Sequence, residues 1–169
     1  MDEVFLADDG FMVVSGGQSG ADRAALDWAI GQGVRHGGWC PRGRRTEDGV
    51  LPQYYLLQET PSASYLQRTK WNVRDSDATL IFTLTDRLDG GSKRTATFAD
   101  SLNKPWLHVR PGVHPKYVAR FLLRHGVKTL NVAGKRESSA PGIGDLVQQV
   151  LSQAVHAPPA DTPQSPERP

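Results

Sequence analysis

The chain has 169 residues with a single cysteine, and its 20 Lys and Arg residues against 18 Asp and Glu residues give a formal net charge of +2. This length suits one domain, and a near-neutral charge without basic runs argues against nucleic acid as a partner. A lone cysteine excludes an intrachain disulfide and suits a reducing cytoplasm, the expected location. No apolar run reaches the ~18 residues of a membrane helix, and the histidines lack metal-ligand spacing, so we expect neither a membrane partner nor a metal site.

Short apolar runs alternate with helical patterns along the chain. Strands are expected at residues 11–15, 36–40, 78–84, 105–109 and 128–133. Helices are expected at about residues 21–30, at 62–75 with Ser62 as the N-cap, at about 95–102, from Pro115 to a stop at Gly126, and at about 142–154. The segment 41–61 shows no periodicity, and a connection this long is usually functional.

This alternation predicts an α/β fold, namely a single Rossmann-like three-layer domain that spans residues 1–156. The run at 78–84 is apolar on both faces, as is typical of a central strand in a parallel sheet. We expect a mainly parallel sheet of about five strands with helices on both faces. Residues 157–169 are rich in Pro, Ser, Asp and Glu and are expected to form a disordered tail.

The first expected strand leads directly into a glycine-rich turn, Ser15-Gly16-Gly17-Gln18-Ser19-Gly20-Ala21-Asp22. Such glycines let main-chain N–H groups approach an anion, and the following helix directs its positive end at it. The spacing matches neither Gly-x-Gly-x-x-Gly nor the Walker pattern, so an ordinary dinucleotide fold or P-loop NTPase is not indicated. The turn could instead serve only the change from strand to helix, and Asp22 could either cap that helix or accept a sugar hydroxyl.

Polar motifs follow the expected strands at four points, in the loops that begin at Ser15, Cys40, Thr85 and Gly134. Ligands of parallel sheets bind beyond the carboxyl ends of the strands, so we expect these loops to converge. The second loop carries Arg42, Arg44 and Arg45, whose planar forks match phosphate oxygens, although the loop could also be solvated or form a subunit interface. The third carries a second candidate phosphate turn, Gly90, Gly91 and Ser92 with Thr95, where Thr95 could instead cap a helix.

The motifs together resemble a known family, the putative molybdenum carrier family, which is the circularly permuted YpsA-like branch of the SLOG (SMF/DprA–LOG) Rossmann superfamily. The resemblance covers about residues 11–155 and rests on residues 15–27, 38–45, 68–77, 90–92 with Thr95, 133–138 and 141–142. In unpermuted relatives a Gly-x-Arg turn precedes the Gly-Gly-x-x-Gly turn, whereas here the Gly-Gly turn comes first. The resemblance therefore implies that the last strand lies beside the first and that Arg136 returns to the pocket of Gly16 and Gly20.

The same resemblance implies a test for catalysis. Related LOG proteins are phosphoribohydrolases that use an Arg in the helix before the central strand and a Glu three residues after the Thr of a Pro-Gly-Gly-x-Gly-Thr turn. Arg68 stands in the place of that Arg, but Phe98 stands in the place of the Glu. A phenyl ring can neither assist the attack of water nor stabilise an oxocarbenium-like centre. Arg68, Glu47 and Asp48 are the catalytic candidates if the chain is nevertheless an enzyme.

The expected function is the binding of a nucleotide-type or phosphate-bearing cofactor ligand, as in a molybdenum carrier. A molybdopterin-type cofactor, molybdate, an AMP-like nucleotide and an ADP-ribose-like nucleotide are all compatible with N–H donors. The alternatives are a LOG-like nucleoside 5′-monophosphate phosphoribohydrolase and a sensor of a nucleotide-derived signal. Asn72 could bind a base edge or only tie down a loop. The candidate ligand-binding residues are Gly16, Gly17, Gln18, Ser19, Gly20, Asp22, Arg42, Arg44, Arg45, Arg68, Asn72, Gly90, Gly91, Ser92, Thr95, Arg136, Glu137 and Ser138.

Besides the small phosphate-bearing ligand, a second copy of the chain is an expected partner. Trp39, Tyr54 and Tyr55 near the long loop could anchor a subunit interface. The resemblance implies a homo-oligomer, either a dimer or a tetramer.

Overall fold

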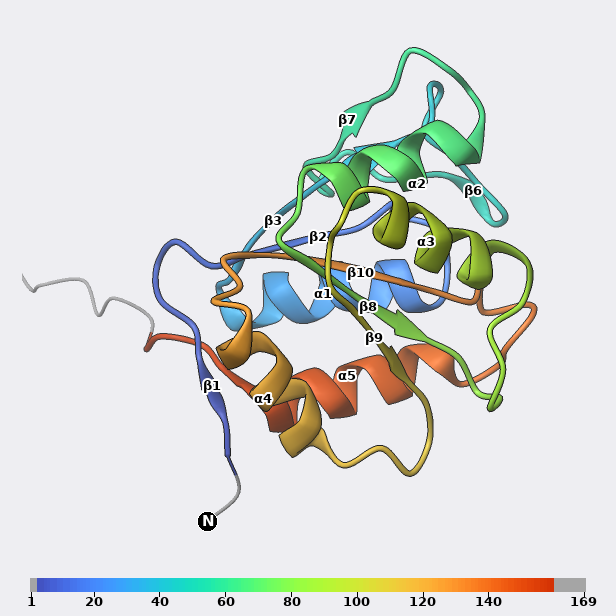
Figure 1. The fold of residues 1–169 in the computed structure, drawn as a ribbon. Coiled ribbons are helices and arrows are strands. Elements are labelled where there is room, and N and C mark those ends of the chain that lie inside the picture. The colour runs from blue at the N-terminus through green and yellow to red at the C-terminus, as the bar shows by residue number, and fades with distance from the viewer. Residues whose placement is uncertain (1–2, 160–169) are drawn as a thin grey trace, which may run out of the picture.

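A five-stranded parallel sheet forms the centre of the computed structural model, which describes residues 3–159 (Figure 1). Its strands follow the order β3 (Arg35–Gly37), β2 (Met12–Val14), β10 (Thr129–Gly134), β8 (Ala78–Phe82) and β9 (Trp106–Val109). The predicted Rossmann-like α/β fold is confirmed. The tail expected at 157–169 lies, beyond residue 159, outside the described residues.

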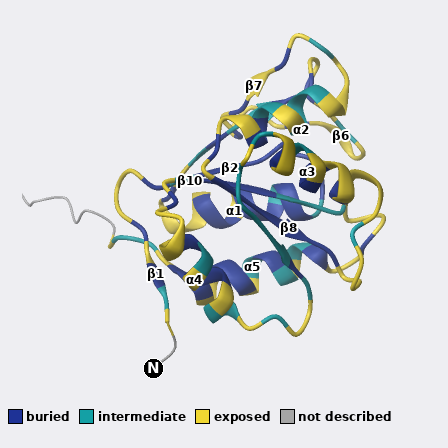
Figure 2. Cartoon of the chain, viewed as in Figure 1, coloured by how far each residue is buried: buried dark blue, intermediate teal, exposed yellow. Residues whose placement is uncertain are grey.

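Helices cover both faces of the sheet, which completes the three layers (Figure 1). One layer holds α1 (Ala21–Gln32), α4 (Pro115–Arg124) and α5 (Ile143–Ala154), with α5 packed against both of the others. The other layer holds α2 (Tyr65–Arg74) and α3 (Gly90–Ser101), which pack against each other. Every residue of β8 is buried, as expected for a central strand (Figure 2). No helix within residues 3–159 is long and apolar enough to cross a membrane.

The permuted strand order is visible in the middle of the sheet. Strand β10 pairs in parallel with β2 on one side, where Leu130 lies opposite Val13, and with β8 on the other, where Ala133 lies opposite Ile81. The prediction that the last strand of the sheet lies beside the first is confirmed. The loops that follow β2 and β10 consequently leave the same edge of the sheet.

Two helices begin at residues other than those predicted. The hydroxyl of Ser64, rather than that of Ser62, accepts a hydrogen bond from the N–H of Leu66 (3.2 Å) and caps α2, whereas the hydroxyl of Ser62 accepts from the N–H of Ser64 (3.0 Å) in the preceding turn. Helix α3 begins at Gly90 and not near Thr95. The alternative role of Thr95 as an N-cap is wrong, since its hydroxyl donates within the helix to the carbonyl of Gly91 (2.9 Å).

The strand expected at 36–40 divides at Gly38, whose φ is 120°. A side chain there would come within 2.5 Å of the carbonyl oxygen of Ser15, so only glycine fits this close crossing. Beyond it, β4 (Trp39–Cys40) leaves the central sheet and pairs with β7 (Gln58–Glu59). The segment 41–61 also contains the hairpin of β5 (Arg45–Thr46) and β6 (Gly49–Val50), whose strands are too short to show an alternating pattern.

A two-stranded parallel pair joins the beginning and the end of the domain. Strand β1 (Phe5–Leu6) pairs with β11 (Val155–His156), so residues from opposite ends of the described chain lie side by side (Figure 1). Phe5 and Val155 are buried in the main core with Phe11. The sequence did not predict this pair, because two residues cannot display a strand period.

Candidate functional site

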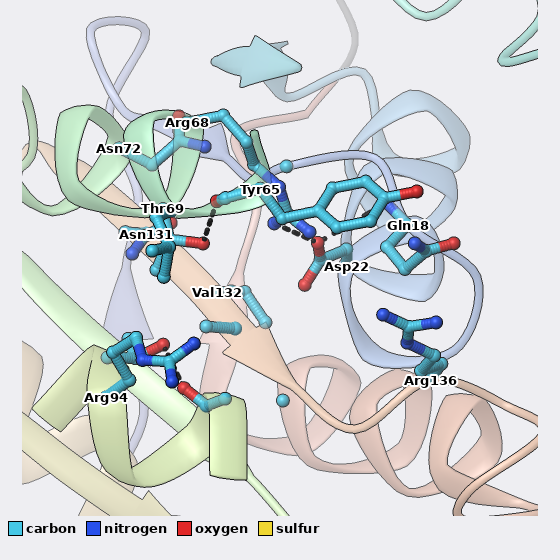
Figure 3. A pocket seen from close by; sticks show the side chains of 16 residues that line it. Gln18, Asp22, Tyr65, Arg68, Thr69, Asn72, Arg94, Asn131, Val132 and Arg136 are labelled. Atoms are coloured by element: carbon cyan, nitrogen blue, oxygen red, sulfur yellow. Dashed lines mark hydrogen bonds and ion pairs between the residues drawn. The ribbon is translucent and has the colours of Figure 1, made fainter. Parts of the chain in front are cut away.

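A cavity of about 250 Å³ lies at the carboxyl end of β10, between the two helices α2 and α3 and the loop that follows β2 (Figure 3). Parallel α/β sheets bind their ligands at this edge. The residues that line it are Gly16, Gln18, Asp22, Tyr65, Leu66, Arg68, Thr69, Asn72, Gly91, Arg94, Thr95, Asn131, Val132, Ala133, Gly134 and Arg136. The expected return of Arg136 to the pocket of the opening turn is confirmed.

The charges of the lining are three arginines and one carboxylate. Arg68 comes from α2, Arg94 from α3 and Arg136 from the loop after β10, and the latter two enter from different sides (Figure 3). The guanidinium groups of Arg68 and Arg136 lie 5.5 Å and 5.7 Å from the ring centre of Tyr65. The lining is therefore net positive, which suits an anionic group.

Asp22 is the carboxylate, and it is already paired. Its Oδ2 accepts from Arg68 Nη1 (3.1 Å) and from the main-chain N–H of Gln18 (3.3 Å). Burial raises the pKa of Asp22 above its ordinary value, while the charge of Arg68 and the N–H of Gln18 oppose that rise. The ion pair with Arg68 holds the Asp22 carboxylate in one position inside the cavity. Asp22 does not cap α1, because the N–H group that it binds is that of Gln18, in the turn before the helix.

Four main-chain N–H groups of the opening turn have acceptors within the protein, and the bond from Gln18 to Asp22 is one of them. The N–H of Gly17 donates to Ser15 Oγ (3.3 Å), that of Ser19 to Gln18 Oε1 (3.1 Å), and that of Ala21 to the carbonyl of Lys135 (3.1 Å). This differs from the expectation that the turn offers its N–H groups to an anion. The reason is that three side chains, those of Ser15, Gln18 and Asp22, and the carbonyl of Lys135 supply these acceptors.

The glycines of this turn leave room for neighbouring protein atoms. A side chain at Gly16 would overlap the guanidinium of Arg68, and one at Gly17 would come within 2.7 Å of Leu51. At Gly20 a Cβ would lie 2.5 Å from the carbonyl oxygen of Lys135. The protein itself therefore requires glycine at these three positions. This agrees with the alternative interpretation, in which the turn serves only the change from strand to helix. Of the three, Gly16 lines the cavity.

The three arginines of the long loop lie outside the cavity lining. Arg44 is 6% exposed, and its guanidinium donates to the carbonyls of Leu51, Pro52, Tyr55 and Leu57 at 2.8–3.1 Å. It holds the segment 51–57 in place, so its predicted contact with a ligand is not supported by its position. Arg42 and Arg45 are exposed.

The aromatic anchors proposed for a subunit interface differ in exposure. Tyr54 is exposed, whereas Tyr55 is 3% exposed and its hydroxyl donates to Asp27 Oδ1 (2.5 Å). Trp39 is half-buried against Trp71 and donates through its indole N–H to Asp75 Oδ2 (2.8 Å). Tyr55 is therefore a core residue of the loop and not an interface anchor.

The acidic candidates Glu47 and Asp48 form the tip of the β5–β6 hairpin and also lie outside the lining. The hydroxyls of Ser19 and Ser138 donate to the Glu47 carboxylate and lower its pKa. Two hydrogen bonds from Arg23 to Asp48 (2.6 and 3.0 Å) lower the pKa of Asp48 to about 2. Both groups are held as carboxylates that close the surrounding loops, so neither stands ready to give a proton in the cavity.

The remaining predicted residues have mixed positions. Asn72 accepts from the N–H of Trp39 (2.8 Å) and donates to its carbonyl (2.9 Å), so it ties α2 to β4, although it also lines the cavity. Glu137 accepts from the N–H of Gly142 (2.7 Å) at the start of α5. Gly91 and Thr95 line the cavity, whereas Gly90, Ser92, Ser138 and Glu137 do not.

Eight lining residues were missing from the predicted site, and the four of them with polar side chains are Tyr65, Thr69, Arg94 and Asn131. One face of α2 has the i, i+3, i+4, i+7 spacing and holds Tyr65, Arg68, Thr69 and Asn72. Because Arg68 and Asn72 were predicted, this spacing could have identified the other two residues. Arg94 lies three residues after Gly91 on α3. Asn131 is a buried amide in β10 that donates to Thr79 Oγ1 (3.2 Å), which no sequence pattern indicated.

The parallel sheet, its strand order and a polar cavity at the carboxyl end define a Rossmann-like α/β domain. The chain belongs to the circularly permutated YpsA SLOG family, whose model matches residues 13–155. Within residues 3–159, no group of three or more His, Cys, Asp or Glu side chains is arranged to hold a metal ion.

One solved structure agrees with this assignment. The crystal structure of a putative molybdenum carrier protein from Syntrophus aciditrophicus SB is similar with a TM-score of 0.80 and 41% identity, over 83% of this chain and 92% of that chain. A second structure, of (E)-4-hydroxy-3-methyl-but-2-enyl diphosphate reductase, has a TM-score of 0.39 and 12% identity over 85% of this chain and 59% of that chain. No curated protein sequence matches the chain.

Proposed function

We propose that the cavity binds a small ligand with a phosphate or similar oxyanion, either a nucleotide or a phosphate-bearing cofactor. The observation that carries this proposal is the balance of charge in the lining. Asp22 pairs with Arg68 (3.1 Å), whereas Arg94 and Arg136 make no ion pair with any residue in 3–159. Two guanidinium groups that make no ion pair within the described residues and enter one cavity from different sides (Figure 3) are suited to oxyanion oxygens.

The first turn of α3 supports the same ligand chemistry. Asp89 is the N-cap residue of α3, but its carboxylate accepts no hydrogen bond from the N–H groups of the helix and is paired with Lys135 instead. Added Cβ atoms at Gly90 and Gly91 would meet nothing within 4 Å, and Gly91 lines the cavity. The positive end of this helix is therefore accessible to an anion beside Arg94.

The size and polarity of the cavity limit the ligand. Its volume of about 250 Å³ lies just below the usual ~300–1,000 Å³ of small-molecule sites. It suits a mononucleotide-sized ligand, or one part of a larger cofactor, better than a whole dinucleotide. Asp22, Thr69 and Asn131 add polar groups that could contact a base, a sugar or a pterin ring.

A carrier role is consistent with this chemistry. The relative from Syntrophus aciditrophicus is described as a putative molybdenum carrier protein. The lining contains neither Cys nor His, so a molybdenum cargo would be held through its oxyanion oxygens or through a phosphate-bearing organic part, rather than by soft protein ligands.

Binding is better supported than hydrolysis. Phosphoribohydrolysis needs a free carboxylate next to the glycosidic bond. In the described cavity lining Asp22 is the one carboxylate, and Arg68 and the turn already use it. Glu47 and Asp48 are bonded elsewhere. The homo-oligomer, the cytoplasmic location and the sensor role stay predictions.

Calorimetric titration tests the proposal. AMP, inorganic phosphate and molybdate are titrated into the wild type, into Arg94→Ala, into Arg136→Ala and into the double variant. Loss of a charge-assisted hydrogen bond should weaken binding about tenfold or more per arginine. Arg45→Ala removes an exposed arginine outside the cavity and should leave affinity unchanged. Undiminished affinity in the double variant would refute the proposal, and release of adenine from AMP would support the hydrolase instead.

Native mass spectrometry of the freshly purified protein would identify a retained ligand and count the subunits. A bound phosphate-bearing species is the expected result. A retained ligand without any anionic group would contradict the proposed chemistry.

A further inference from the structure

The carboxamide of Gln18 has one defined orientation. Its Oε1 accepts from two main-chain N–H groups, that of Ser19 (3.1 Å) and that of Glu47 (2.8 Å). A main-chain N–H can only donate, so the oxygen of the amide must face these groups and its NH₂ must face away. Gln18 lines the cavity and is 5% exposed.

The nitrogen of this amide is a buried donor without an acceptor. Gln18 Nε2 has no hydrogen-bond partner among the described residues, and the same holds for Arg68 Nε, which belongs to another lining residue. Buried donors are nearly always paired in folded proteins because an unpaired one is costly. In a cavity that binds a ligand, the expected partner is an acceptor atom of that ligand.

The β5–β6 hairpin holds the amide in this orientation. The Glu47 carboxylate accepts from the hydroxyls of Ser19 and Ser138, so it bridges the loop after β2 and the loop after β10. Asp48, the next residue, is bonded to Arg23 of α1 at 2.6 and 3.0 Å. These contacts fix the N–H of Glu47 over Gln18, although Glu47 itself does not line the cavity.

We propose that Gln18 determines the specificity of the cavity by donating from Nε2 to an acceptor atom of the ligand, and that Glu47 is a positioning residue that fixes this donor. This inference rests on the proposed function, namely that the cavity binds a small phosphate-bearing ligand. It adds that the ligand presents a carbonyl oxygen, an unprotonated ring nitrogen or a phosphate oxygen to Gln18. A ligand with an amino group at this point is rejected, because two donors would face each other without an acceptor.

Two substitutions at Gln18 distinguish the loss of the Nε2 donor from the effect of an added negative charge. Gln18→Glu keeps an oxygen for both N–H groups and replaces the NH₂ by a second oxygen, whereas Gln18→Met removes the donor, together with the Oε1 acceptor of Ser19 and Glu47, without adding charge. Both should weaken the binding of AMP about tenfold or more in calorimetric titration. Gln153→Glu on the exposed surface of α5 is the matched control and should leave the affinity unchanged.

The results have distinct meanings. Weaker binding in Gln18→Glu alone would indicate charge repulsion and would overturn the inference, as would unchanged or tighter binding in both variants. Thermal melts of the variants confirm that each is folded. If Arg94→Ala and Arg136→Ala weaken binding while both Gln18 variants do not, the proposed function stands and this inference falls. If neither AMP nor inorganic phosphate binds the wild type, both fall.

A double-mutant cycle tests the role of Glu47. Glu47→Ala should lower the affinity for AMP several-fold in the wild type and should cause no further loss in Gln18→Met, because the donor that it positions is then absent. An equal loss in both backgrounds would show that Glu47 acts only through the general structure of the loops, and the positioning role would be wrong.

Discussion

The chain contains two glycine-rich turns that each lead from a strand into a helix, and they differ in what occupies the space around them. At Gly17 and Gly20 an added Cβ would meet protein atoms at 2.7 and 2.5 Å. At Gly90 and Gly91 it would meet nothing within 4 Å. The first turn is therefore filled by the protein itself, whereas the second is open.

The hydrogen bonds of the two turns differ in the same way. Asp22 and Gln18 supply acceptors to two N–H groups of the first turn, whereas no side chain caps the N-terminus of α3. A glycine motif thus indicates that other atoms come close to the main chain or that φ is positive there. It does not show whether those atoms belong to the protein or to a ligand. In this domain the arginines and the open turn carry the anion chemistry, and the closed turn supplies Gln18 and Asp22 in fixed orientations.

The largest expected effect comes from the same substitution made in the two turns. Gly20→Ala places a Cβ against the main chain of Lys135 and Glu137 at a φ of 78°, and main-chain atoms cannot move aside cheaply. We expect a loss of about 3 kcal/mol or more in the free energy of unfolding in urea. Gly91→Ala, in open space within α3, should instead be neutral or stabilise by up to about 1 kcal/mol. Similar losses in both variants would break the comparison.

The support of the closed turn extends to Arg44. Its guanidinium binds four carbonyls of the segment 51–57, and Leu51 and Leu57 of that segment pack on Gly17. Arg44→Ala should cost about 2–4 kcal/mol of unfolding free energy, because several buried carbonyls lose their donor. The exposed neighbour provides the control, since Arg45→Ala should change stability by no more than about 0.5 kcal/mol. Equal stabilities of the two variants would exclude the structural role of Arg44.

The smallest effect concerns the hairpin tip that closes over the first turn. The pKa of Asp48 is lowered from 3.8 to about 2 by Arg23, so the ionised form is favoured in the folded state. The resulting stabilisation is complete above about pH 4 and is lost as the pH falls towards 2. Because the pair is partly exposed, Asp48→Asn should cost only about 0.5 kcal/mol at pH 5. In urea unfolding series the difference from the wild type should shrink below pH 4, and a pH-independent difference would contradict this origin.

The central fold could be predicted because its signals are local. The buried run of β8 has an apolar pattern on both faces. That β10 lies beside β2 was implied only by the resemblance to a permuted family. The start of α3 could not be predicted, since glycine disfavours helix and two successive glycines are typical of a turn. The same limit applies to β1 and β11, whose pairing depends on residues about 150 positions apart.

The candidate site was predicted less completely than the fold. Arg68, Arg136, Gln18 and Asp22 lie where the motifs placed them, at one cavity. Arg44 was misassigned because charge alone does not distinguish a guanidinium that binds phosphate from one that binds main-chain carbonyls. Arg94 and Asn131 were missed because the packing of α3 and β10 places them at the cavity, and no motif in the neighbouring sequence indicates that position.

The position of β10 also constrains the order in which the protein can fold during synthesis. Strands β3 and β2 form one half of the sheet and β8 and β9 the other, and β10 is the strand that pairs with both halves. Until residues 129–134 have left the ribosome, each half exposes an unpaired strand edge. The nascent chain is therefore most vulnerable to aggregation just before β10 emerges, and insertion of this strand is the step that creates a continuous sheet and, with it, the floor of the cavity.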